Sequence, residues 1–443
     1  MKWKEVFSNF GFIILFFVVV SSTALINNSK VDIDFSDKRI FLAAVLFASL
    51  WVSSGLFYIL FFAINKKIGP KIIETESLYL ELKDETKKIQ NYDQKFIAFP
   101  FLKDCESLAK KLNDAWCNNK MDTVRNLVSA GLYNRFKIQL KIMDSQDVRN
   151  VMDHWMLNKL ILKSADSNGE FQEIHVEISA RAKDKNLPKA LTDDEIKSEL
   201  ESVKQSSYTE IWSFIRKRGI QSDFTKSLLS GHCPNCGTGI DDLGELNKCK
   251  SCGSIINSGE YDWVLSEITQ YEEWTNNSAK GTVDLSSFIN ESPLANKQMI
   301  EDRASYLFWR WIDAGAQNRK DPLLRDSTKN FLDSFNSFNN YFYDTAVGAV
   351  DLKGFKKLDD GYEASVLILW SAAGSSTSQP IHKENKFYLK ITGTTKKSGG
   401  LSENSCETCG APLPESDSLK CDYCNSDTPP LVSDWLLDKI ESA

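Results

Sequence analysis

Four Cys-x-x-Cys pairs constrain this chain more than any other feature of its sequence. The first two pairs are separated by a short polar loop, and the same arrangement returns near the C-terminus. Two such turns direct four thiolates at one metal ion, and this spacing is typical of a zinc ribbon. We therefore predict two structural Zn²⁺ sites, with the ligands Cys233, Cys236, Cys249 and Cys252 in the first and Cys406, Cys409, Cys421 and Cys424 in the second.

The residue after the second cysteine of such a turn often needs a positive φ. That position is held by Gly237, Gly253, Gly410 and Asn425, the residue types that tolerate this conformation best. Four thiolates leave no open coordination position, so we expect the metal to stabilise the fold and not to catalyse. His232 is then expected to be a neighbour of the first ligand and not a ligand itself.

Cysteine usage also indicates the redox environment. Eight of the ten cysteines belong to the ribbons, which leaves only Cys105 and Cys117. Zinc ligands must stay reduced and deprotonated, so a cytoplasmic compartment fits better than an alternative with four disulfides. The two remaining cysteines lie on a predicted helix beside apolar residues, and we expect them to be buried.

The acidic charge argues against nucleic-acid binding. The formal net charge is −7, and the segment 401–443 carries nine carboxylates against Lys420 and Lys439. Acidic residues also surround the first ribbon. Phosphate binding needs clustered Lys and Arg, so no nucleic-acid partner is expected.

Two long uncharged stretches near the N-terminus predict membrane spans. Residues 6–28 and 40–65 contain no charged side chain, and each is long enough to cross a hydrocarbon layer of ~30 Å. We predict a transmembrane hairpin with both ends in the cytoplasm. In the alternative, the first stretch is a cleaved signal peptide; both interpretations leave the C-terminal bulk in the cytoplasm.

Two α+β units follow, because apolar residues at helical spacing come first and short strand-like segments come after them. In the first unit we predict helices over 105–116 and 122–141 and strands over 159–163, 171–179 and 208–215. In the second we predict helices over 299–314 and 323–339 and strands over 346–356, 362–370 and 386–391.

The two units are an internal duplication. The offset is 173 residues between Cys233 and Cys406, and 172 between Asp262 and Asp434. The segments that close each copy, YDWVLSEI and SDWLLDKI, match almost position by position. We expect each to form a short helix whose tryptophan packs the ribbon onto its sheet.

These features divide the chain into seven segments. They are a transmembrane hairpin (1–70), a polar helical stalk (71–95), a first α+β domain (96–230), its zinc ribbon (231–270), a linker (271–294), a second α+β domain (295–400) and its zinc ribbon (401–443). Packing of residues 71–95 on the first domain is an alternative to the stalk.

Several stretches carry a family resemblance: FLKDCESLAKKLNDAW, NLVSAGLYNRF, WSFIRKRG before the first ribbon, GEYDWVL after it, and IEDRASYLFWRW. The chain resembles a bacterial family of membrane-anchored zinc-ribbon proteins with Tim44-like domains, similar to subunit 44 of the mitochondrial inner-membrane translocase. The resemblance implies two cone-shaped α+β domains like nuclear transport factor 2, and a location at the bacterial inner (cytoplasmic) membrane. The mitochondrial relative helps to organise a preprotein import motor, but bacterial members lack that translocase.

No catalytic constellation is evident. His154 and His175 are the local candidates, and ordinary polar positions explain both. We therefore expect a non-enzymatic, membrane-anchored cytoplasmic scaffold or adaptor for protein partners, in protein transport or membrane-protein assembly. In the alternative, the cone-shaped domains bind a lipid or another apolar small molecule, which requires a cavity of ~300 Å³ or more. The aromatic-rich second unit is expected to be core, with an exposed partner groove as the other reading.

Overall fold

The computed structural model describes residues 72–74, 78–168, 171–240, 247–274, 283–291, 296–335, 343–375, 378–392, 406, 408–409, 411, 420–427 and 434–442. The chain divides into two compact units, Met1–Gly69 and Pro70–Ala443, and every described residue lies in the second. The predicted membrane spans at 6–28 and 40–65 lie outside the described residues. Among the residues that are described, no helix is both long and apolar enough to cross a membrane.

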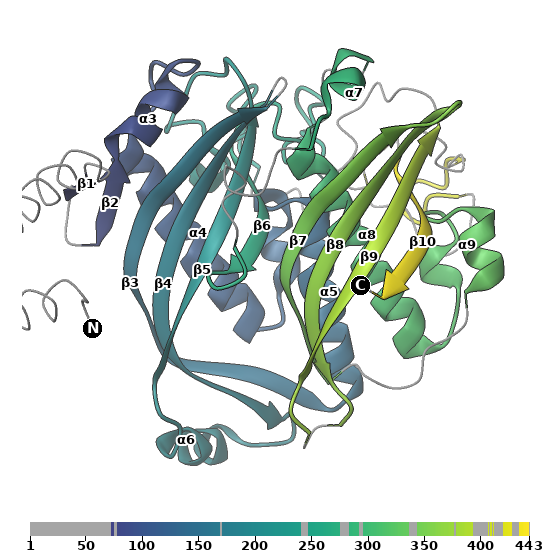
Figure 1. Cartoon of the computed structure of the whole chain (residues 1–443). Coiled ribbons are helices and arrows are strands. Elements are labelled where there is room, and N and C mark those ends of the chain that lie inside the picture. The colour runs from purple at the N-terminus through teal and green to yellow at the C-terminus, as the bar shows by residue number, and fades with distance from the viewer. Residues whose placement is uncertain are drawn as a thin grey trace, which may run out of the picture. The chain divides into compact units, whose positions relative to one another are not determined.

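Two β-sheets form the framework of this unit (Figure 1). The first has the order β1-β2-β3-β4-β5-β6 and the second the order β10-β9-β8-β7. The strands are β1 (Ile72–Glu74), β2 (Tyr79–Leu82), β3 (Val148–Asn168), β4 (Phe171–Pro188), β5 (Ser206–Lys217), β6 (Val264–Gln270), β7 (Tyr343–Lys357), β8 (Gly361–Ala373), β9 (Ile381–Thr392) and β10 (Leu436–Ser442). The meander of three antiparallel strands expected in each copy is formed by β3-β4-β5 and by β7-β8-β9, and β6 and β10 each add a fourth antiparallel strand.

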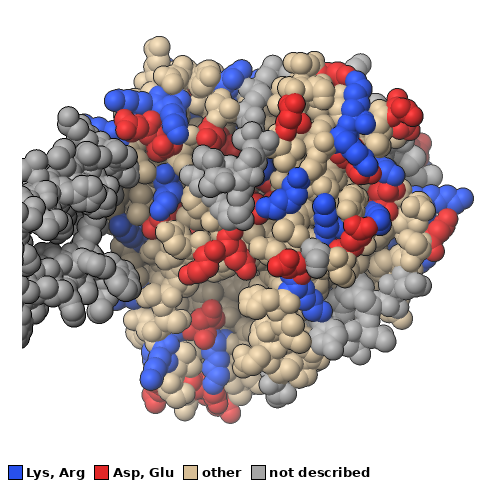
Figure 2. Space-filling view, viewed as in Figure 1, with Lys and Arg blue, Asp and Glu red and all other residues tan. Residues whose placement is uncertain are grey.

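Helices α4, α5 and α8 lie behind the strands in the view of Figure 1. The α-helices are α3 (Lys83–Gln90), α4 (Ala98–Cys117), α5 (Ala130–Ser145), α6 (Asp193–Glu201), α7 (Ser286–Glu291), α8 (Lys297–Gln317) and α9 (Lys329–Ser334). Within the described residues, the chain also forms the short 3₁₀ helices η1 (Met121–Leu127), η2 (Leu228–Ser230) and η4 (Asp321–Leu323). On the face drawn in Figure 2, basic and acidic side chains are interspersed over the described surface.

Each predicted second helix is divided by a capping residue. Ser129 accepts a hydrogen bond from the Leu132 N–H at 3.1 Å, so α5 begins there and η1 precedes it. Thr328 accepts in the same way from the Phe331 N–H at 3.2 Å and starts α9. A hydroxyl that satisfies a free N–H favours a new helix start over continuation of the preceding turn.

The duplication predicted from sequence is confirmed at the level of element order, since each copy has helix, 3₁₀ turn, capped helix, three strands, ribbon and final strand. Asn119 and Asn318 end the first helices with φ of 53° and 52°. The Ser129 N–H donates to the Leu265 carbonyl at 2.8 Å, and its counterpart Thr328 donates to Leu437 at 2.9 Å. These pairs fix an offset of 199 residues between the helices of the two copies.

The segment 71–95 is not a helical stalk. β2 pairs in parallel with β3, where Leu80 lies opposite Ile161, and α3 follows directly. Tyr79 and Ile89 are both buried in the first core. The apolar residues among the charges of this segment therefore extend the first sheet and cover it, which is the alternative of packing on the first domain.

The Asp-Trp segments also differ from expectation, because they lead into strands and not short helices. Leu265 of β6 pairs with Phe214 of β5, and Leu437 of β10 pairs with Leu389 of β9. The apolar residues of so short a segment fit either period, and an open sheet edge decides between them. Trp435 packs inward, with 2% of its surface exposed, against the rings of Phe288 and Phe355.

The two copies share a junction at helices α5 and α8. A Cβ at Gly131 would collide with the Asp302 carbonyl oxygen, so these helices approach closely at that point. The Ser129 hydroxyl donates to the Asp302 carboxylate, and Lys141 pairs with Asp313 at 3.0 Å. Ile138 of α5 is buried within the core of the second copy.

A buried guanidinium holds the second copy together. Arg303 of α8 pairs with Asp326 at 2.8 Å and with Asp434 at 3.5 Å, and it donates to the Trp435 carbonyl at 2.9 Å. Burial opposes its charge, but the two carboxylates outweigh burial and raise the pKa of Arg303 above its usual value. This one side chain thus ties α8 to the residues that lead into α9 and into β10.

Replacing Arg303 with Met should lower the free energy of unfolding by about 3–5 kcal/mol, because two buried carboxylates lose their cation. Denaturant unfolding of the full chain measures this change. Arg319→Met is the matched control, since its pair with Asp321 is surface-exposed and should contribute about 0–1 kcal/mol. Equal effects of the two substitutions would contradict the assigned role.

Candidate metal centres and buried charged sites

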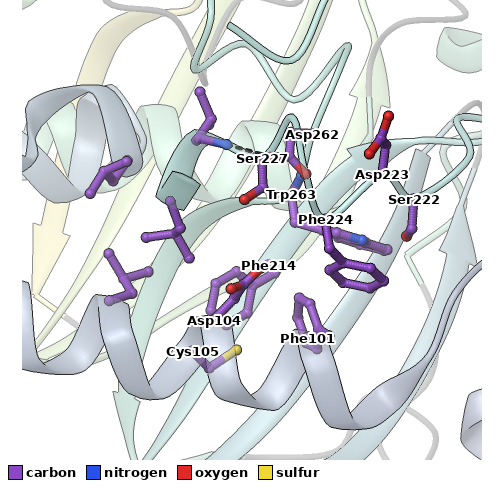
Figure 3. Close-up of a pocket in the computed structure, with 14 residues that line it drawn as sticks. Phe101, Asp104, Cys105, Phe214, Ser222, Asp223, Phe224, Ser227, Asp262 and Trp263 are labelled. Atoms are coloured by element: carbon purple, nitrogen blue, oxygen red, sulfur yellow. Dashed lines mark hydrogen bonds between the residues drawn. The ribbon is translucent and has the colours of Figure 1, made fainter. Parts of the chain in front are cut away.

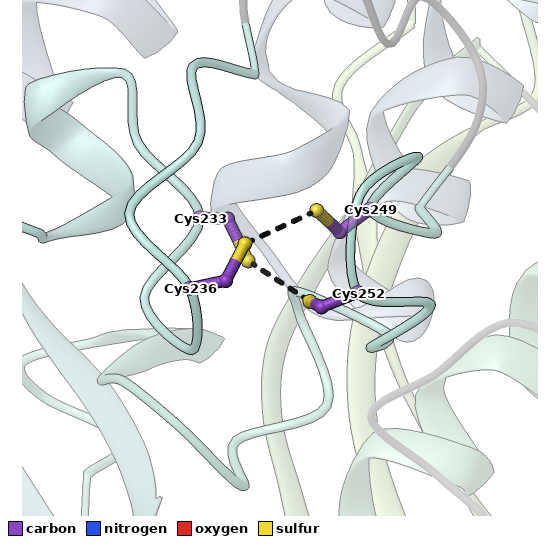
Figure 4. Close-up of side chains that lie close together, drawn as sticks. All are labelled: Cys233, Cys236, Cys249 and Cys252. Atoms are coloured by element: carbon purple, nitrogen blue, oxygen red, sulfur yellow. Dashed lines mark hydrogen bonds between the residues drawn. The ribbon is translucent and has the colours of Figure 1, made fainter.

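The structure brings the eight predicted ligands together as two separate clusters of four cysteines. In the first cluster the sulfurs of Cys233 and Cys252 lie 3.8 Å apart, and those of Cys236 and Cys249 lie 3.7 Å apart (Figure 4). A Zn–S bond of ~2.3 Å with tetrahedral angles places sulfurs ~3.8 Å apart. The donor set and its spacing therefore fit a tetrahedral zinc ion.

The second cluster has the same geometry. The sulfurs of Cys406 and Cys424 are 3.6 Å apart, and those of Cys409 and Cys421 are 3.7 Å apart. All ligand atoms of a cluster lie within 4.8 Å of one another. Each cluster could thus hold one ion in a closed four-thiolate shell.

The backbone of the turns matches the sequence argument. Gly237, Gly253 and Asn425 have φ of 78°, 75° and 56°, as predicted, while Gly410 lies outside the described residues. The N–H of Gly237 returns to the Cys233 carbonyl at 2.7 Å, which closes the turn. Positive φ at these positions lets each pair of sulfurs point to one side of its loop.

The first ribbon is attached to the core of its own copy. Cys233 and Cys249 are buried and pack in the first hydrophobic cluster with Ile240 and Ile256. The Asn257 side chain donates to the Val128 carbonyl at 3.0 Å, just before α5 begins. A bound metal would therefore stabilise both the ribbon and its contact with the helices.

Purified full-length chain should contain two zinc ions, and Cys249→Ser and Cys421→Ser should each contain one. Loss of one thiolate opens the shell, and structural zinc contributes ~10–16 kcal/mol to the folding of small zinc domains. Elemental analysis gives the stoichiometry, and thermal unfolding should show a lower Tm for both variants.

Cys117→Ser is the control for that experiment, because this half-buried thiol belongs to neither cluster. It should retain two ions. Retention of two ions by a ligand variant would contradict the assignment.

The histidines do not converge on one site. His175 is buried, its Nδ1 lies 2.9 Å from the Ser213 hydroxyl, and burial lowers its pKa to about 4. His154 is exposed beside Asp153 at 3.5 Å, and His232 is exposed with Nδ1 at 2.8 Å from the Ser230 carbonyl. None of these three belongs to a cysteine cluster.

Two other predictions concern apolar positions. Cys105 is buried, as predicted, and burial raises the pKa of its thiol well above the usual value. Cys117 is half-buried.

Of the aromatic residues in the second copy, Phe308 and Trp309 are fully buried, and the ring centroids of Trp311 and Trp370 lie 5.9 Å apart. Core packing therefore accounts for these rings.

A charged cluster between the two copies was not predicted from the sequence. Lys297 and Glu301 of α8 form an ion pair at 2.7 Å, and Glu173 of β4 and Glu267 of β6 lie beside them. Both carboxylates accept hydrogen bonds from β7 of the second copy: Glu301 from the Leu352 N–H at 2.7 Å, and Glu267 from the Val350 N–H at 3.1 Å. The turn of α8 that carries Lys297 and Glu301 thus lies between β4 and β6 of the first sheet and β7 of the second.

Burial dominates the titration of this cluster. It raises the pKa of Glu173 to about 7, which Lys297 partly opposes. It raises the pKa of Glu267 to about 8, and the charge of Glu301 adds to the increase. The cavity at this place, about 20 Å³, has room for one or two water molecules.

The free energy of unfolding should fall as the pH rises from 6.5 to 8.5. The pKa of Glu267 is about 8 in the folded chain and about 4.5 in the unfolded chain. Such a carboxyl contributes its full stability below pH 4.5, and this contribution is lost as the pH rises through the folded pKa. His175, whose pKa is lowered from 6.5, makes stability rise with pH, but only below pH 6.5 and thus outside this window. Denaturant unfolding across this window should show a smaller slope for Glu267→Gln.

Glu272→Gln is the control for this slope, because its side chain is exposed on the same segment after β6. It should leave the pH dependence as it is in the parent chain. An unchanged slope in Glu267→Gln would show that this carboxyl does not contribute.

A second unpredicted feature is a pocket in the first copy, of about 40 Å³ (Figure 3). Its carboxylates are Asp104 from α4, Asp223 and Asp262, and we call it the carboxylate pocket. Its walls include the rings of Phe101, Phe214, Phe224 and Trp263. Burial and the charge of Asp262 raise the pKa of Asp104 to about 6, although Lys111 opposes them.

Comparison with known proteins gives one family match. Residues 82–226 match the family model described as the Tim44-like domain, which covers part of the first copy and about a third of the chain. That segment therefore carries a Tim44-like domain. No curated protein matches the sequence.

One solved structure is described as an NTF2-like protein involved in plasmid conjugation. It is 8% identical and covers 74% of this chain and 96% of its own, with a TM-score of 0.19. A similarity at this level carries no argument about function. The α+β architecture of both copies rests on the two sheets and their helices themselves.

Proposed function

We propose that this protein is a membrane-anchored scaffold or adaptor that presents two α+β copies to protein partners, in protein transport or membrane-protein assembly. The observation that carries the proposal is the Tim44-like match over 82–226. In the relative that the sequence resembles, this domain organises other proteins at a membrane. We expect the uncharged stretches 6–28 and 40–65 to provide the anchor here, at the bacterial inner membrane with the described part in the cytoplasm.

The closed cysteine clusters support a scaffolding role over catalysis. We propose zinc as the ion, since four thiolates at ~3.8 Å suit its tetrahedral preference. Such a shell has no position for a substrate. The Ser213–His175 contact is a buried pair beside a cavity of about 20 Å³, which is too small for a substrate of ordinary size.

Binding of a lipid inside the domains has less support. Small-molecule sites measure ~300 Å³ or more, whereas the two cavities named above measure about 40 and 20 Å³. The ring-lined interior of the second copy is filled by Phe308, Trp309 and Phe387, all fully buried. Partner binding on the outer surface is therefore the function that we favour.

The test separates anchoring from partner binding. The full-length chain should remain in the membrane fraction after an alkaline carbonate wash, and a chain that lacks residues 1–70 should be released. Affinity capture from detergent-solubilised membranes should recover defined protein partners with the parent chain. Cys249→Ser combined with Cys421→Ser should lose them, because the last strand of each copy depends on its ribbon.

A tagged membrane protein of unrelated fold is the control for the capture. Recovery of no partner above that control would contradict the adaptor role. Release of the full-length chain by carbonate would contradict the anchor.

A further inference from the structure

The carboxylate pocket has a counterpart in the second copy. The offset of 199 residues makes Asp104 the counterpart of Arg303 and Leu127 that of Asp326. Asp262 corresponds to Asp434, since each accepts a hydrogen bond from the N–H of the tryptophan that follows, at 2.8 and 2.7 Å. Asp104, Leu127 and Asp262 all line the pocket.

In the second copy this space is occupied by the guanidinium of Arg303. It contacts Asp326, Asp434 and the Trp435 carbonyl, as described above. In the first copy an aspartate replaces that arginine, and the space is open. The same backbone frame therefore surrounds the Arg303 guanidinium in the second copy. In the first copy it surrounds a cavity in which Asp104 adds a carboxylate to that of Asp262.

The charge of the cavity remains negative. Three carboxylates line it, and its described lining contains neither Lys nor Arg. Two cations outside the lining act on it: Arg216 of β5 attracts Asp262, and Lys111 attracts Asp104. Arg216 is itself paired with Asp93 at 2.6 Å and lies over the Trp263 ring at 4.3 Å. Among the described residues, the Asp104 side chain has neither a hydrogen bond nor an ion pair, and the Asp262 carboxylate accepts only from the N–H groups of Trp263 and Leu228.

The size and walls of the cavity also suit a basic side chain. A volume of about 40 Å³ holds roughly three water-sized groups, which is close to the head of an arginine side chain. The rings of Phe101, Phe214 and Phe224 would cover the apolar stem. Guanidinium is favoured over ammonium because its planar donors can serve two carboxylates at once, as Arg303 does.

We propose that the carboxylate pocket binds an arginine side chain of a partner polypeptide, in the place that Arg303 fills in the second copy. The polypeptide nature of the ligand rests on the proposed adaptor function; the preference for a guanidinium rests on the comparison of the two copies alone. Asp104 and Asp262 are the binding residues, with Asp223 at the rim.

The probe for this site is N-acetyl-arginine amide, with the neutral N-acetyl-citrulline amide as its matched control. Calorimetric titration of the detergent-solubilised full chain should show binding of the arginine probe. The citrulline probe should bind about tenfold or more weakly, because it lacks the charge-assisted hydrogen bonds.

Asp104→Asn should weaken binding of the arginine probe about tenfold, through loss of one carboxylate. Asp104→Arg should abolish binding, because it restores the side chain found at 303. Asp114→Asn is the control, since this carboxylate is exposed on the same helix and away from the pocket. Thermal unfolding of each variant shows whether the fold is kept.

Absence of binding by the arginine probe, equal affinity for the two probes, or unchanged affinity in Asp104→Asn would each overturn the proposal. Partner capture distinguishes it from the adaptor function. If partners bind the Asp104→Asn chain as tightly as the parent, the pocket is excluded while the adaptor role stands. If the probe binds but no partner is captured, the adaptor role fails and the guanidinium preference stands.

Discussion

The structure of each copy depends on a strand that returns to its sheet only after a loop that carries a four-cysteine cluster. In the first copy the chain leaves the sheet at Lys217 and comes back at Val264, and α5 begins against the returning strand through Ser129 and Leu265. Closing so long a loop costs conformational entropy. The ribbon has too few apolar residues to offset this cost by hydrophobic burial alone. Four thiolates on one ion would supply that free energy, and a bound ion would thereby stabilise the final strand in its place.

The junction between the copies follows from the same arrangement. α5 starts where the returning strand fixes it, and its first turn packs on Asp302 of α8 through Gly131 and Ser129. The charged cluster of Glu267, Glu301 and Lys297 then joins β6 to α8 and β7. Buried charges of this kind add little net stability compared with apolar contacts, but they tolerate few alternative registers. The junction is therefore better suited to fixing the two copies in one arrangement than to adding stability.

The two copies differ in charge at one matched position of their shared backbone frame, where Asp104 corresponds to Arg303. Arg303 closes the second copy from inside, whereas Asp104 leaves the first copy open and negative. The offset between copies is 199 residues in the helices but 173 in the ribbons, because the first copy carries longer strands and the α6 insertion. In the second copy Arg303 fills this space and stabilises the fold. In the first copy the space is open, and it is the site that we propose for binding.

The sequence by itself determined the features that depend on local spacing. The turns of the cysteine clusters, the positive φ at Gly237 and Gly253, and the meander strands follow from residues a few positions apart. Only the tertiary structure decided the features that depend on distant partners. The Asp-Trp segments became strands because a sheet edge was open to them, and 71–95 joined the first copy because β3 offered an edge to β2. Asp104 and Asp262 meet although 158 residues separate them. Such pairs leave no periodic signal, because the chain between them, and not the residues themselves, sets their distance.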